Sequence, residues 1–254
     1  MITPLDQAHA QMDQSDDARL RFYERLADAE LFLLLAREAD GDQIEPKLFE
    51  LEEGTLVLAF DREERLAAFA GAAPYAALSG RALAQMLSSD NLSLGLNLDV
   101  APSSIILPHA AMVWLNDTLG QGPKDIEAKP EELLPPKNIP EHLLTSLDTK
   151  LALTGGLARC AYLCGVRYHD GIQSHMLALI DPVPGAEPAL ARAVNEALVF
   201  SGIDAGAIDV AFFTASDPIA ARLAQIGLRF DLPEPERPSQ PTVPGMDPAK
   251  PPKL

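Results

Sequence analysis

Two serines, an aspartate and a histidine lie close together in the sequence and are the residue types of a hydrolytic triad: Ser103, Ser104, Asp99 and His109. In such a triad the histidine takes the serine proton and the carboxylate orients the histidine, so the side chains must converge in space. Proximity in the sequence does not provide this convergence, and the chain has no Gly-x-Ser-x-Gly elbow. A hydrolase using Ser104 and His109 is therefore the alternative hypothesis.

Three other polar residues, Tyr75, Arg81 and Asn97, are candidates for a binding site. Arg81 falls in the first turn of a predicted helix, where the positive end of the helix dipole disfavours a cation. A carboxylate or an anionic ligand is expected to compensate it. A surface ion pair with Asp99 or Glu63 is the favoured interpretation, because such pairs are common. A contact site for a partner or ligand is the other.

No metal or cofactor site is predicted. If Asp170-Gly171 forms a two-residue turn, His169 pairs with Ile172 and His175 faces Val166. The two imidazoles would then lie on opposite faces of the hairpin. Thr154–Leu157 contains two glycines but lacks the Gly-Lys-Ser/Thr ending of a phosphate loop.

The two cysteines of the chain are predicted to be core thiols. Cys160 and Cys164 fall on the apolar face of an alternating stretch that is typical of a strand. Four residues along a strand span roughly 13 Å, which is too far for a disulfide or a shared metal.

Composition disfavours several classes of function. The chain has 254 residues, of which 37 are acidic and 20 are basic, so its formal charge is −17. This charge disfavours binding to nucleic acids and to anionic membranes. The longest apolar run, Leu31 to Ala36, is far shorter than the roughly 20 residues of a membrane helix. The first residues lack the basic and apolar parts of a signal peptide, and we expect a soluble cytoplasmic protein.

The elements that would position these residues begin with a strand–helix–strand unit from Leu48 to Leu115. Two strands meet at a turn over 52–54, two short helical patterns follow, and leucines alternate with polar residues from Leu92 to Leu98. Asp61 is expected to cap the first of these helices. A helix beginning near Asp16 and a buried strand over 30–36 precede the unit, while residues 1–15 are expected to be a frayed terminus.

The remainder of the chain predicts a second folded region. Prolines punctuate 119–140, which is predicted to be a linker. A helix over 141–153, a hairpin over 157–180, and the helix–strand–helix–strand order over 189–232 follow. The tail 233–254 is rich in proline and is expected to be disordered. The fold class is α+β, with two mixed-sheet-plus-helix domains over 17–118 and 141–232.

The first region resembles the N-terminal domain of the SseB family (enhanced serine sensitivity protein). The pieces that carry the resemblance are Leu48-Phe49, Val57–Asp61, Glu64–Phe69, Tyr75, Leu78–Arg81, Leu96-Asn97 and Trp114-Leu115. The second region is similar to the C-terminal domain of the family at Ala161–Leu163, Asp170-Gly171 and Asp209-Val210. This chain has Leu98-Asp99 where family members often have Gly or Pro, so that turn is expected to differ. The resemblance implies no agreed biochemical activity.

These observations favour a non-catalytic adaptor or regulator that binds a protein or a small ligand. An unidentified protein is the expected partner, and the sequence sets no oligomeric state. A further possibility is that Pro-x-x-Pro runs in the tail, such as 235–238 and 241–244, dock on a partner.

Overall fold

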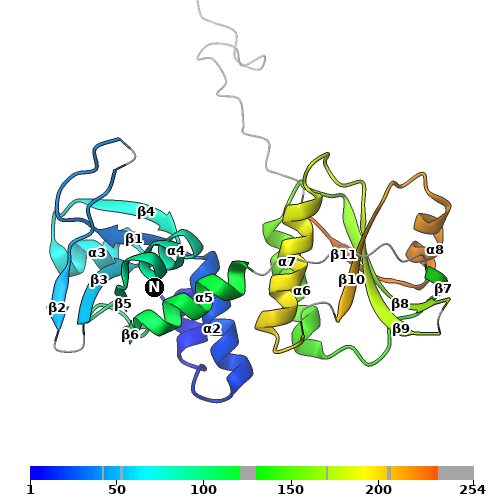
Figure 1. The fold of residues 1–254 in the computed structure, drawn as a ribbon, viewed down its shortest axis with the longest axis horizontal. Coiled ribbons are helices and arrows are strands. Elements are labelled where there is room, and N and C mark those ends of the chain that lie inside the picture. Colours follow the sequence, from blue (N-terminus) through cyan, green and yellow to red (C-terminus); the bar gives the residue numbers. More distant parts are fainter. Residues whose placement is uncertain (42, 52–53, 121–129, 170, 205–206, 234–254) are drawn as a thin grey trace, which may run out of the picture.

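The computed structural model describes residues 1–41, 43–51, 54–120, 130–169, 171–204 and 207–233. Two sheet-and-helix regions lie side by side along the long axis of the molecule (Figure 1). The described residues thus have the α+β architecture that the sequence predicts, with one mixed sheet in each region.

The first region contains one sheet and five helices. In chain order its elements are α1 (Pro4–His9), α2 (Asp16–Asp28), β1 (Glu30–Leu34), β2 (Phe49–Leu51), β3 (Gly54–Phe60), α3 (Glu63–Ala70), β4 (Tyr75–Ser79), α4 (Gly80–Asp90), β5 (Ser93–Leu96), β6 (Ile105–Leu107) and α5 (His109–Gly120). The strand order is β4-β1-β3-β5-β6, and β2 pairs with β3. Only β3 and β5 run parallel, because α3, β4 and α4 return the chain between them.

Each face of this sheet buries a different set of side chains. On one face the alternating positions of β1, β3 and β5 pack against the apolar sides of α2, α4 and α5. On the other face Leu34, Leu58 and Phe60 pack against Leu66 of α3. The sheet is therefore covered on both sides, as the apolar runs in its strands require.

The second region repeats this layered plan with fewer helices. Its elements are β7 (Pro130–Leu134), α6 (Glu141–Leu153), β8 (Cys160–Tyr168), β9 (Gln173–Ile180), α7 (Glu187–Phe200), β10 (Ile208–Phe213), α8 (Pro218–Ile226) and β11 (Leu228–Asp231). The strand order is β10-β9-β8-β11, and β7 pairs with the other end of β8. Helices α6 and α7 cover one face and α8 covers the other.

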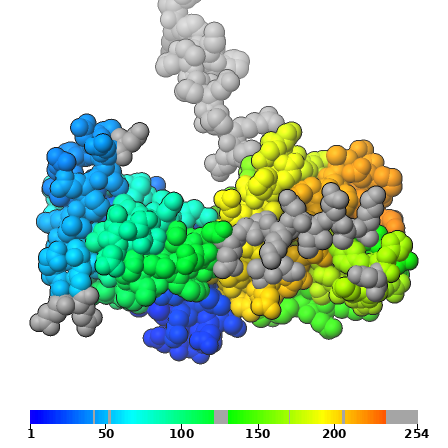
Figure 2. Space-filling view, viewed as in Figure 1, coloured from blue at the N-terminus to red at the C-terminus, as the bar shows by residue number. Residues whose placement is uncertain are grey.

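The two regions are packed against each other. Phe200, the last residue of α7, is fully buried among the core residues of the first region. Its ring lies 6.4 Å from that of Trp114 on α5. Figure 2 shows the C-terminal part of α5 against the helical side of the second region. The regions therefore share buried surface in addition to their covalent connection.

Three predicted boundaries were wrong. Residues 1–15 are not all frayed, since Thr3 caps α1 in a capping box with Asp6 and Leu5 is buried. Tyr75–Ser79 is the edge strand β4, paired along its whole length with β1, where we expected a bridge between helices. The predicted linker 119–140 contains β7, because Leu133 packs into the core beneath β8. Residues 121–129 of that segment and 234–254 of the predicted tail lie outside the described residues.

Candidate functional site

Asn97 is a structural residue buried at the end of β5. It has a left-handed backbone with φ 50°, and none of it is exposed. Its Oδ1 accepts a hydrogen bond of 3.0 Å from the backbone N–H of Asp61, and its Nδ2 donates one of 2.8 Å to Ser103. The amide thus ties the loop after β5 to the end of β3.

The hydrogen-bond chain from Asn97 continues into a buried ion cluster. Ser103 Oγ donates to Asp6 Oδ1 at 2.6 Å, and Arg65 donates to the same carboxylate. Arg65 also donates to Asp61 at 2.7 Å. Burial alone would raise the pKa of Asp6, but the hydrogen bonds from Arg65, Ser103 and Thr3 outweigh it and hold the pKa well below its usual range. Asp61 therefore pairs with Arg65 and does not cap α3 as predicted, because Arg62 holds the N-cap position without a side-chain bond.

The serines of the hydrolase hypothesis form hydrogen bonds with groups other than His109. Ser103 lies in the cluster just described, and Ser104 Oγ accepts a hydrogen bond of 3.3 Å from the backbone N–H of Asp99. The Nδ1 atom of His109 is buried and has no hydrogen-bond partner in the described part of the chain. These contacts do not form the serine–histidine–carboxylate relay that acyl transfer requires.

Arg81 forms an ion pair as expected, but its partners are not Asp99 or Glu63. Its guanidinium donates to Asp28 at 3.0 Å and to Glu196 at 3.1 Å. Glu196 belongs to α7, so the side chain bridges the two regions. The positive end of α4 is compensated by a carboxylate that lies 115 residues away in the chain.

Lys150 of α6 completes this interface network, which the sequence did not reveal. Its ammonium nitrogen lies 2.7 Å from Asp28 and 3.0 Å from Glu196. Ser146 donates to Glu24, whose pKa burial raises despite the nearby Lys150. Burial would also raise the pKa of Glu196, but Arg81 and Lys150 lower it overall. Each charged group of the network has a partner of opposite charge within the chain.

Tyr75 is partly exposed on the edge strand β4. Its ring packs edge-on against Phe32 at 5.6 Å. A hydrogen bond to Glu63 raises the pKa of its hydroxyl. The three candidate binding residues therefore lie apart. Tyr75 is at a sheet edge, Arg81 is at the interface between the regions, and Asn97 is in the interior.

The remaining candidate residues are also accounted for. The hairpin register is shifted by one residue from the expected one, so His175 pairs with Gly165 and not with Val166. His175 Nε2 lies 3.0 Å from the carbonyl oxygen of Lys137, and His169 lies 3.7 Å from Glu131. No group of three or more His, Cys, Asp or Glu side chains within the described ranges could hold a metal ion. Both cysteines are free and buried, as predicted.

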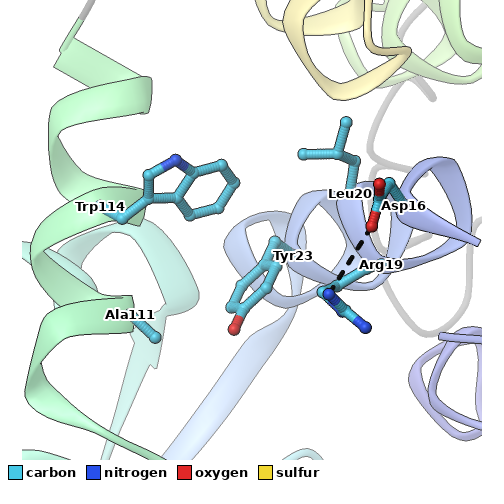
Figure 3. A pocket seen from close by; sticks show the side chains of 6 residues that line it. All are labelled: Asp16, Arg19, Leu20, Tyr23, Ala111 and Trp114. Atoms are coloured by element: carbon cyan, nitrogen blue, oxygen red, sulfur yellow. Dashed lines mark ion pairs between the residues drawn. The ribbon is translucent and has the colours of Figure 1, made fainter. Parts of the chain in front are cut away.

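A groove open to solvent lies between α2 and α5, as Figure 3 shows. Its volume is about 360 Å³, and it is lined by Asp16, Arg19, Leu20, Tyr23, Ala111 and Trp114. The rings of Tyr23 and Trp114 meet edge to face at 5.1 Å, and Trp114 is 39% exposed. Asp16 and Arg19 form an exposed ion pair of 3.7 Å at the rim. We call this surface the α2–α5 groove.

Comparison with known families identifies the first region. Residues 5–114 match the model of the SseB protein N-terminal domain. The chain carries an SseB N-terminal domain. The match begins in α1 and ends at Trp114, so it includes α2, the first half of α5 and the residues of the ion cluster around Arg65. No curated protein and no solved structure matches the chain. The similarity of the second region to the family's C-terminal domain stays a prediction.

The helices were also compared with the length and hydropathy of a membrane-spanning helix. Among the helices that the structure describes, none is long and apolar enough to cross a membrane.

Proposed function

We propose that the chain is a non-catalytic, cytoplasmic adaptor or regulator that binds another protein through the SseB domain. The observation that carries the proposal is the α2–α5 groove, where an exposed Trp114 and a half-buried Tyr23 present apolar surface to solvent. Tryptophan and tyrosine dominate the energy of protein interfaces because they bury a large apolar area and still carry a polar group.

The polar clusters support a binding role over a catalytic one. The buried carboxylates around Arg65 and Lys150 are paired inside the fold, where they stabilise a loop and the interface between regions. Within the described residues Ser104 and His109, the alternative hydrolase pair, share no hydrogen bond. The charge of −17 supports a partner that is not a nucleic acid or an anionic membrane.

The test compares three tagged full-length chains in affinity purification from native lysate. Leu20→Asp places a charge inside the groove, and Ile106→Asp places the same charge on an exposed apolar residue of β6. We expect proteins retained by the wild type and by Ile106→Asp to be lost with Leu20→Asp. An identical set of proteins on all three chains would contradict the proposal.

A further inference from the structure

The α2–α5 groove has the chemistry of a proline-binding surface. Proline-rich segments dock on exposed aromatic rings, since their extended helix is preformed and loses little entropy on binding. Tyr23 and Trp114 supply two such rings, set edge to face at 5.1 Å. The exposed carboxylate of Asp16 lies at the rim in a 3.7 Å ion pair with Arg19, and a basic residue beside the prolines would compete with Arg19 for it.

The chain itself contains a matching ligand. Beyond the last described residue the sequence is rich in proline, and its end reads Pro248-Ala249-Lys250-Pro251-Pro252-Lys253-Leu254. This stretch places Pro248 and Pro251 at Pro-x-x-Pro spacing and adds two lysines. Within a chain of charge −17, this short cationic stretch is attracted to the acidic body of the protein.

The segment is long enough to reach the groove. Pro233 lies beside Gly155. A Cβ atom added to Gly155 would lie 2.9 Å from the Pro233 carbonyl oxygen. From Gly155 back to Ser146 the helix α6 covers roughly 14 Å, and Ser146 contacts Glu24, the neighbour of Tyr23. With the side chains and the width of α2 added to this roughly 14 Å of helix, the groove lies on the order of 30 Å from Pro233. Residues 234–248 as an extended proline helix span about 45 Å.

We propose that the α2–α5 groove binds the proline-rich segment 248–253 of the same chain, with Pro248 and Pro251 on the rings of Tyr23 and Trp114 and Lys253 near Asp16. The proposal rests on the proposed function, in which this groove binds another protein. It adds that the ligand is a proline-rich segment, and that the chain's own segment competes with any partner for the groove. A tethered ligand has an effective concentration of about 1 mM, so even a weak contact keeps the groove occupied.

Trp114 is the only tryptophan of the chain, so its fluorescence reports on the groove and on the adjoining contact with Phe200. The experiment uses full-length chains: the wild type, a variant with Pro248, Pro251 and Pro252 changed to Ser, and a control with Pro235, Pro238 and Pro241 changed to Ser. We expect the emission maximum of the first variant to shift to longer wavelength, because its Trp114 becomes more hydrated. The control is expected to match the wild type.

A synthetic peptide of residues 233–254 then tests the ligand directly. We expect it to reverse the shift in the first variant and to leave the wild type unchanged, whose groove is occupied. Equal emission from all three chains, without response to the peptide, would overturn the proposal. A shift that depends on chain concentration would also overturn it, by assigning the ligand to a second copy.

The failures of the two proposals are distinguishable. If Leu20→Asp loses partner proteins while the tail variants leave Trp114 emission unchanged, the binding function stands and the tail is not the ligand. If the tail variants shift the emission while Leu20→Asp retains every partner, the groove binds the tail and the partner surface lies elsewhere.

Discussion

The ammonium nitrogen of Lys150 lies 2.7 Å from a carboxylate oxygen of Asp28, although 122 residues separate the two in the chain. Lys150 is 3% exposed, and Glu196 is equally buried beside it. Buried charges are tolerated only when they are paired, so this contact requires the two regions to stay together. The SseB domain and the second region consequently behave as one packed unit in our interpretation.

Replacing Lys150 with Met should destabilise the whole chain. The substitution keeps the apolar stem but leaves Asp28 and Glu196 with one cation fewer in a buried position. Removal of one partner from a buried ion pair typically costs about 3–5 kcal/mol. We expect that loss in the free energy of unfolding, measured by urea denaturation at neutral pH.

The matched control is Lys137→Met. Lys137 is exposed, and its described contact is made by its backbone carbonyl. Surface substitutions of this kind usually change stability by less than about 0.5 kcal/mol. Equal destabilisation by the two substitutions would show that the buried network contributes nothing.

Asp6→Asn should remove a pH-dependent part of the stability. The pKa of Asp6 lies well below its usual range in the folded chain, so the ionised form stabilises the fold. This contribution is fully present above the unfolded pKa of about 4 and is lost as the pH falls below it. We expect the variant to be less stable than the wild type by about 3 kcal/mol at pH 7.

The acid side of the stability curve provides the check on that prediction. The difference between the wild type and Asp6→Asn should shrink as the pH falls from about 4 towards about 2, because the carboxyl of the unfolded wild type becomes protonated there while that of the folded chain stays ionised. Thermal unfolding followed across this range measures it. A difference that stays constant with pH would mean that Asp6 acts through its shape and not its charge.

Local sequence patterns predicted most of the elements correctly. The alternating leucines from Leu92 to Leu98 contain β5, and Gly171 lies in the expected turn between β8 and β9. Both follow from periodicity and turn chemistry, which act over a few residues. Strand β4 was missed because Tyr75–Ser79 has little β-branched character, and its pairing with β1 supplies the stabilisation.

The charged contacts could not be predicted in the same way. The sequence showed that Arg81 needs a carboxylate, but the one that reaches it, Glu196, lies on a helix of the other region. Nothing in the local pattern around Lys150 distinguishes it from a solvated lysine. Interactions between distant segments depend on how the two regions pack, and one sequence alone does not contain that information in readable form.

Both cysteine thiols should be unreactive in the folded chain. Burial raises the pKa of Cys164 to about 11, so almost none of it is thiolate at pH 8, and thiolate is the reactive form. We expect a thiol reagent to modify neither cysteine under native conditions and both in denaturant. Rapid native modification would show that the core around β8 opens easily.

Asn97 provides a test of what holds the loop after β5. In Asn97→Ala the N–H of Asp61 loses its partner, which costs about 1–3 kcal/mol, and the left-handed backbone costs about 1–2 kcal/mol more. Asn97→Gly removes the same hydrogen bonds but adopts the left-handed backbone readily. We therefore expect both variants to unfold at lower urea concentration than the wild type, with Gly the milder. If Asn97→Gly unfolded at the same urea concentration as the wild type, the left-handed backbone alone would explain why position 97 is asparagine.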